Sequence, residues 1–268
     1  MAPDRAASGR PCARRGAYAC QMRVTIRLFA MLRERAGASE LVLELPEGAR
    51  VRDALAAPAV AALAEGLPLV MAVNREYASE DAPLSPGDEL ALVPPVSGGA
   101  EEAAPDAAAA SGAAAGQAAA APKAAAGGER AAAPHVAVRD EPLSLDALVA
   151  RVRDPRAGAV VTFSGVTRAV DELVYEAYRE MAVEQMAAIV AEAIARHGLC
   201  AAAAEHRVGR VPLSEPSVLV AVSAPHRPEA FAGAREIIDR VKAAAPIWKQ
   251  EVEDGAASWV DGTAPPAG

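Results

Sequence analysis

The chain has 268 residues, which corresponds to one large domain or two small ones, and its formal net charge is −8. An acidic chain is a poor candidate for binding nucleic acid, and no apolar run approaches the length of about 18 residues that a membrane span needs. The three cysteines, Cys12, Cys20 and Cys200, have neither metal-like nor paired spacing. We therefore expect no metal site, no disulfide scaffold and a reducing, cytoplasmic location.

The first 21 residues differ in charge from the rest of the chain. They carry four Arg against one Asp and lack the apolar centre of a secretory signal. Their composition has some likeness to a transit peptide, but they contain only one Ser. We expect a disordered extension over residues 1–21, or a start placed upstream of a true start at Met22.

Residues 22–99 are predicted to form a small α+β domain. Alternating apolar residues indicate strands, and helical spacing over 51–65 indicates a helix that Pro58 divides. The expected order is strand, strand, helix, strand, strand, in a sheet covered on one face. The expected strands are 22–30, 41–45, 69–73 and 89–93, with a turn at 85–88.

Residues 100–134 contain 20 alanines in 35 positions, interrupted by Gly and Pro. Alanine favours helix, but this segment has no apolar stripe to bury. We expect a flexible linker whose ends lie about 30–35 Å apart on average.

Residues 135–268 are predicted to form a second α+β domain. Ser144 can cap a helix, Gly198 can end one and Pro228 can begin one. The continuous apolar run 158–165 predicts a central strand, and the alternating run 172–178 predicts its neighbour. The other expected elements are helices over 145–153, 180–197 and 228–244, and strands over 203–208, 217–223, 248–253 and 258–260.

Several features could carry chemistry, and each has a structural alternative. The run Pro94–Gly99 ends a strand with two glycines, which could thread a narrow channel or could be an ordinary exit into a linker. His226 and Arg227 precede a helix N-terminus, where an anion is favoured, but they could form an exposed turn. Arg168 projects from a loop after a strand and could be a surface arginine. We assign the pair His206-Arg207 to structure.

The lysines are unusually few. Only three of the 27 basic residues are Lys, and two of them, Lys242 and Lys249, flank Pro246. On a helical wheel Lys242 falls about 20° from Phe231, at the edge of an apolar stripe. We expect it to be partly buried and suited to proton transfer, although its stem could instead cover the core while the ammonium reaches water. The remaining residues of the expected stripe are Ala234, Ile238 and Val241.

Both domains resemble the subunits of one enzyme family, molybdopterin synthase. In residues 22–99, RLFAMLRERAG, LPLVMAVN and PLSPGDELALVPPVSGG resemble its ubiquitin-like small subunit. In residues 135–262, VTFSGVTR, YEAYREMA, EHRVGR, SAPHRPEAF, RVKAAAPIWKQE and SWV resemble its large subunit. The resemblance implies a fusion of α+β class: an N-terminal β-grasp domain, a flexible Ala-rich linker and an α/β-hammerhead-like catalytic domain over 135–268.

The resemblance also implies an activity. In this family, cyclic pyranopterin monophosphate becomes molybdopterin with sulfur from thiocarboxylated small-subunit tails. The implied carrier tail is Gly98-Gly99, and the implied catalytic residues are Lys242, Lys249 and Gly99. No bound cofactor is implied, and the implied partners are a homodimeric copy, a sulfur-loading adenylating enzyme and a protease. The implied substrate-binding residues are Phe163, Val166, Thr167, Arg168, His226, Arg227, Lys242, Lys249, Gln250 and Glu251.

The sequence departs from the family in two places. Ala100 follows Gly99, so the uncut chain has no carboxylate there to activate, and we expect cleavage after Gly99. Ser214 stands where the family usually has Gly, which should alter one turn. Two other interpretations remain open: a ubiquitin-like carrier with a docking module, and an uncleaved, inactive precursor.

Overall fold

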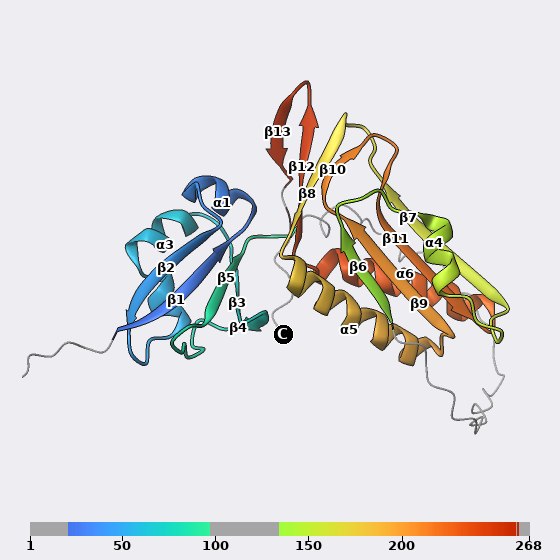
Figure 1. Ribbon diagram of the computed structural model, residues 1–268, viewed down its shortest axis with the longest axis horizontal. Helices are drawn as coiled ribbons and strands as arrows, with labels where there is room; N and C mark the ends of the chain where they lie inside the picture. The colour runs from blue at the N-terminus through green and yellow to red at the C-terminus, as the bar shows by residue number, and fades with distance from the viewer. Residues whose placement is uncertain (1–20, 97–133, 261, 263–268) are drawn as a thin grey trace, which may run out of the picture.

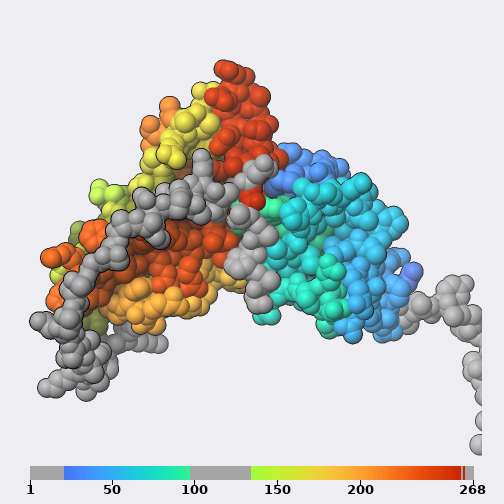
Figure 2. Space-filling view, turned by 180° about the vertical axis from the view of Figure 1, so that it is seen from behind, coloured from blue at the N-terminus to red at the C-terminus, as the bar shows by residue number. Residues whose placement is uncertain are grey.

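The computed structural model describes residues 21–96, 134–260 and 262, which form two lobes that lie against each other (Figures 1 and 2). The expected extension up to residue 20, the Gly98-Gly99 tail and residues 100–133 of the expected linker lie outside the described residues. Among the residues that are described, no helix combines the length and apolar character that crossing a membrane requires.

The first lobe is a five-stranded β-grasp sheet with three short helices. Its strand order is β2-β1-β5-β3-β4, with β1 and β5 parallel and the other pairs antiparallel. The expected strands and the helix divided at Pro58 are confirmed, whereas α1 and β4 were not expected. The elements are β1 (Gln21–Leu28), α1 (Ala30–Ala36), β2 (Glu40–Pro46), α2 (Val51–Leu55), α3 (Pro58–Ala64), β3 (Val70–Val73), β4 (Glu76–Ala78) and β5 (Glu89–Val93).

This sheet is buried on both faces along β5. Leu90 and Leu92 pack into the core beneath the helices, together with alternate residues of β1. Ala91 and Val93 face the other way and join a cluster that includes residues of the second lobe. The expectation of a sheet covered on one face is therefore wrong, because the second lobe covers the other face.

The second lobe contains two four-stranded sheets. One has the order β6-β9-β11-β7 and the other β10-β8-β12-β13. Its helices begin and end near the predicted residues, and Ser144 caps α4 by accepting a hydrogen bond from the Ala147 amide at 3.3 Å. The elements are β6 (His135–Arg139), α4 (Leu145–Arg151), β7 (Ala159–Val166), β8 (Glu172–Ala177), α5 (Arg179–His197), β9 (Ala201–Arg207), β10 (Gly209–Pro212), β11 (Pro216–Ala224), α6 (Arg227–Ala244), β12 (Ile247–Glu253) and β13 (Ala256–Trp259).

Helices cover both faces of the sheet that contains β9 and β11. The long helices α5 and α6 lie side by side on one face, and α4 lies on the other (Figure 1). The run Ala201–Ala204 is buried throughout, because alternate alanines face opposite layers. These small side chains let the helices approach the sheet closely.

Two expectations for the second lobe are wrong. The apolar run 158–165 forms β7, which is an edge strand paired only with β11 among the described strands. Its apolar residues on the outer face, such as Val160, stay exposed. The run 172–178 forms β8, which belongs to the other sheet and pairs with β10 and β12. Ser214 adopts a left-handed conformation with φ of 68°, which explains why glycine suits that turn.

Candidate functional site

A cavity lies where the two sheets of the second lobe meet the C-terminal end of α6. Its volume is about 610 Å³. The end of β7, β9 and β11 form one wall, β8 and β12 form another, and Ile238, Val241 and Ala245 form an apolar side. The polar side chains that line it are Arg168, Tyr175, His206, Ser217, Lys242, Lys249, Glu251 and Glu253.

Strand alternation on β12 separates two surfaces. Lys249 and Glu251 point into the cavity, with Nζ and Oε1 4.0 Å apart, while Trp248 and Gln250 point to the opposite face. Strand β8 repeats this arrangement, because Tyr175 pairs in register with Lys249 and also lines the cavity. One sheet therefore borders the cavity with one face and contacts the first lobe with the other.

Helix α6 contributes Lys242 to the cavity from its last turn. The side chain is exposed rather than partly buried as expected. Phe231, which was assigned to the buried stripe, is 62% exposed, and the buried face of α6 is formed instead by small and aliphatic residues. These are Ala230, Gly233, Ala234, Ile237, Ile238 and Val241.

Five residues predicted for the site line this cavity together: Val166, Arg168, Lys242, Lys249 and Glu251. The other predicted residues that the structure describes lie elsewhere, and Gly98 and Gly99 are outside the described residues.

Phe163 packs against the core of the second lobe. The buried Thr167 hydroxyl donates to the Val211 carbonyl at 3.3 Å, and the Gln250 amide donates to Glu34 of the first lobe at 2.8 Å. His226 and Arg227 are at the N-terminal end of α6, about 24 Å along the helix axis from Lys242.

Four polar residues of the cavity were missed at the level of sequence, one of them Glu253 of β12. Tyr175, His206 and Ser217 come from β8, β9 and β11. The register of β11 shifts between Pro216 and Val218, and this bulge lies at Ser217. A bulge leaves no simple pattern in the sequence. The alternation of residues along the strand that contains Tyr175 was visible, but it did not indicate which face of the strand borders a cavity.

The opposite face of the β8–β12 sheet binds the first lobe through stacked aromatic rings. Phe29 of the first lobe stacks on Tyr178 with ring centroids 4.8 Å apart and on Trp248 at 5.1 Å. The Trp248 indole also donates to the Pro94 carbonyl at 3.1 Å. Trp248 and Tyr178 are each 1% exposed, so this contact is as tightly packed as a domain core.

Polar contacts surround the aromatic cluster. Glu176 of β8 pairs with Arg33 at 2.8 Å and accepts a hydrogen bond from the Ala30 amide at 3.2 Å. Burial raises the pKa of the Glu176 carboxyl above its ordinary value, although Arg33 and the Ala30 amide act in the opposite direction. Arg75 pairs with Glu184 at 2.7 Å.

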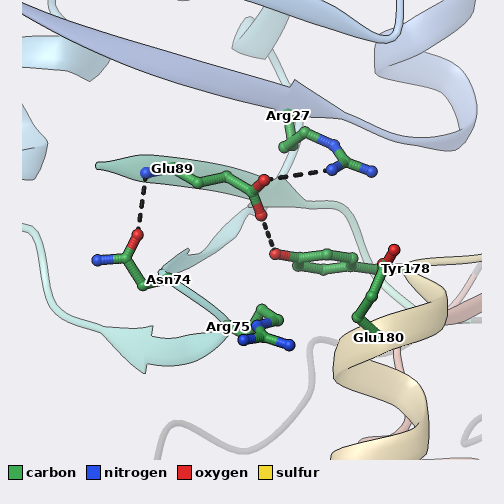
Figure 3. Close-up of a pocket in the computed structure, with 6 residues that line it drawn as sticks. All are labelled: Arg27, Asn74, Arg75, Glu89, Tyr178 and Glu180. Carbon is green, nitrogen blue, oxygen red and sulfur yellow. Dashed lines mark hydrogen bonds and ion pairs between the residues drawn. The ribbon is translucent and has the colours of Figure 1, made fainter. Parts of the chain in front are cut away.

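Figure 3 shows the polar edge of this interface. A hollow of about 320 Å³ lies between Arg27, Arg75 and Glu89 of the first lobe and Tyr178 and Glu180 of the second. The Tyr178 hydroxyl donates to Glu89, which also pairs with Arg27 at 3.2 Å. Burial and the Glu89 carboxylate raise the pKa of Tyr178, so the phenol keeps its proton.

The last described residues of the first lobe contact the C-terminal segment of the second lobe. Val96 is 1% exposed, and Gly262 lies so close to its backbone that a Cβ at position 262 would collide with the Val96 carbonyl. Val260, two residues before Gly262, lines the cavity. Val96, three residues before Gly99 in the sequence, thus contacts a segment whose residue Val260 borders the cavity.

Known families match both lobes. The MoaE protein family matches residues 138–244, and the ThiS family matches residues 26–99. A molybdopterin synthase catalytic subunit from Thermoplasma volcanium is 42% identical over 132 residues, which cover 47% of this chain and 96% of that protein. The chain belongs to the MoaE family. It also carries a ThiS region, so it is a fusion of a small and a large subunit.

Two further relatives match the MoaE region. The molybdopterin synthase catalytic subunit of Oryza sativa subsp. indica is 49% identical over 123 residues, which cover 44% of this chain and 64% of the rice protein. The crystal structure of molybdopterin synthase from Staphylococcus aureus is 32% identical, covers 47% of this chain and 96% of that one, and has a TM-score of 0.45. The chain thus spans less than two thirds of the rice protein.

Contact between the ThiS and MoaE regions should depend on pH through Glu176. Because burial raises its pKa, the folded chain binds this proton more tightly than the unfolded chain does. The associated stability is present below the ordinary carboxyl pKa and is lost as pH rises through the raised value. The side chain of Glu176→Gln is neutral at every pH. As the pH rises through the raised pKa of Glu176, we therefore expect this variant to gain thermal stability relative to the wild type.

The measurement is the melting temperature of both proteins across a pH series. Glu184→Gln is the matched control, because Glu184 lies at the same interface with a side chain that is 53% exposed. Parallel curves for the wild type and Glu176→Gln would contradict the prediction.

Proposed function

We propose that this chain makes molybdopterin by transferring sulfur from a thiocarboxylate at Gly99 to cyclic pyranopterin monophosphate. The observation that carries the proposal is the two-faced β8–β12 sheet. Its outer face binds the ThiS region, and its inner face presents Lys249 to a cavity bordered by Val260, two residues from the contact between Gly262 and Val96. Carrier and cavity are thereby held in one arrangement that suits transfer from tail to substrate.

The cavity suits an anionic substrate. Arg168, Lys242 and Lys249 place three cationic side chains around it against the two carboxylates of Glu251 and Glu253, and this excess of positive charge favours a phosphate ester. In this proposal Lys242 and Lys249 move protons while the cyclic phosphate opens and sulfur adds, and they also hold the substrate or the tail. The reaction requires no resident cofactor, and sulfur arrives on Gly99 rather than on a cysteine.

Replacing either lysine should reduce turnover by about 100-fold or more, because each supplies acid–base or charge stabilisation. The variants are Lys242→Ala and Lys249→Ala, and formation of molybdopterin is measured with a thiocarboxylated carrier. Lys123→Ala is the matched control, since Lys123 is the third lysine and lies in the expected linker.

The same variants separate the enzyme from the alternative of a carrier with a docking module. A docking protein would lack turnover in the wild type as well, while its two regions would still associate. Full turnover in both variants would contradict the assigned roles.

The proposed reaction requires a free carboxylate at Gly99, whereas Ala100 continues the chain. We therefore propose that a protease cuts after Gly99 and that an adenylating enzyme then loads sulfur. Intact-mass measurement of the protein from its own cells should reveal a fragment that ends at Gly99, with sulfur replacing one oxygen in a part of it. A single uncut species that supports turnover would contradict cleavage, and an uncut inactive species would indicate a precursor.

We also propose that two copies pair through β7. This edge strand carries Val160 and Val166, each about half exposed, and Phe231 of the neighbouring α6 is 62% exposed. A two-fold axis pairs identical edge strands antiparallel, so the start of one strand meets the end of the other. His226 follows the Ala224-Pro225 segment that contacts the start of β7, and the end of β7 lines the cavity. Pairing would bring His226 and Arg227 of one copy to the cavity of the other.

A mixing experiment tests this shared site. A dimer that combines a Lys249→Ala chain with a His226→Ala chain has one complete site, so it should recover about half of wild-type activity. The two chains are co-expressed with different tags, and the heterodimer is purified before assay. A dimer of Lys242→Ala with Lys249→Ala is the control, because both lysines belong to the same cavity and no complete site can form. Equal activities of the two heterodimers would overturn the shared site.

A further inference from the structure

Part of the cavity lining is polar but uncharged. Tyr175, His206 and Ser217 form this part, which we call the floor; His206 is 7% and Ser217 5% exposed, whereas Arg168 and Lys242 are exposed. The charged side chains that line the cavity form its rim: Arg168, Lys242 and Lys249, together with Glu251 and Glu253.

The hydrogen bond of His206 determines which ring nitrogen can accept. Nδ1 lies 2.8 Å from the carbonyl oxygen of Arg207, and a carbonyl only accepts, so Nδ1 carries the proton. Burial lowers the pKa of His206 to about 4, and the ring is neutral near pH 7. Nε2 consequently bears a lone pair, and no hydrogen-bond partner for it exists within residues 21–96, 134–260 and 262.

The hydrogen bonds around Tyr175 also fix which of its positions can accept a hydrogen bond. The Ser217 hydroxyl donates to the Gly165 carbonyl at 3.3 Å, so it must accept the proton of the Tyr175 hydroxyl, 3.1 Å away. The Tyr175 oxygen keeps a lone pair, and the ring of Tyr175 meets that of His206 edge-on at 5.0 Å. Both free positions on the floor are acceptors.

We propose that His206, assisted by Tyr175, orients the substrate by accepting hydrogen bonds from N–H groups of its heterocycle. This inference rests on the proposed function. The pterin of cyclic pyranopterin monophosphate carries an amino group and ring N–H donors, and its phosphate is anionic. The donors match the accepting floor, and the phosphate matches Arg168, Lys242 and Lys249 at the rim. The reverse orientation would place an anion against two lone pairs, so the floor selects one orientation.

The test measures binding of cyclic pyranopterin monophosphate to the full chain, without sulfur on the carrier, by anaerobic calorimetry. His206→Phe keeps a ring against Tyr175 but removes the acceptor, and it should weaken binding about 10-fold. His206→Gln restores an acceptor near the Nε2 position and should bind within about threefold of the wild type. Inorganic phosphate, which has no heterocycle, should bind equally to all three proteins.

The outcomes distinguish the inference from the function on which it rests. If the wild type does not bind the pterin, the proposed function fails and this inference fails with it. If the wild type binds but His206→Phe binds equally well, or if phosphate binding falls in parallel, the orienting role alone is overturned. Should His206→Phe not fold, Tyr175→Phe decides, because it removes the second acceptor; unchanged pterin affinity would overturn the role.

Discussion

The arrangement of this protein depends on the two-residue period of one small sheet. Along β12 the side chains alternate between the cavity, which receives Lys249, and the ThiS region, which receives Trp248 and Gln250. A slip of one residue would exchange these sets and bury the lysine against the carrier. The antiparallel pairing of Lys249 with Tyr175 fixes the register of the two strands. Side chains alternate in the same way along β8, so Glu176, next to Tyr175, contacts the ThiS region. The cavity and the surface that contacts the ThiS region are therefore set by a single register.

The few aromatic residues are concentrated where the two regions meet. The chain has two Trp, four Tyr and three Phe, nine in all. Five of the nine belong to the interface cluster or pack against it, namely Phe29, Tyr77, Tyr178, Trp248 and Trp259. The domain cores instead use aliphatic residues and alanine. Large flat rings give much buried area per side chain, which suits a contact between two separately folded surfaces.

Local signals in the sequence predicted the helices of this fold other than α1, because caps and breakers act over a few residues. Ser144, Gly198 and Pro58 each mark a helix end where expected. Strand partners depend on distant residues, so β7 was placed centrally although it is an edge. An apolar run looks the same whether another strand or an unpaired surface lies beside it. Our proposed β7 pairing between two copies would account for that apolar edge.

The candidate site was predicted in part for the same reason. Lys249 and Glu251 share a strand face, which alternation alone implies. His226 and Lys242 were predicted together as substrate-binding residues, but the sequence does not show how one site holds both, because the 18 residues of α6 separate its two ends within one chain. His206 was assigned to structure because a His-Arg pair at a strand end does not reveal its surroundings. Its place on the cavity floor follows from the packing of β9 beside β11 and from the bulge at Ser217.

The contacts between the two regions bear directly on cleavage after Gly99. The principal described contacts join folded surfaces, among them the Phe29 stack, the Arg33–Glu176 pair and the Trp248–Pro94 hydrogen bond. None of them uses the peptide bond between Gly99 and Ala100. Cutting that bond would lower the effective concentration of the carrier at its partner but would leave the interface intact. In the proposed reaction, a fused chain thus begins with its ThiS region already bound to the MoaE region, and cleavage after Gly99 need not release it.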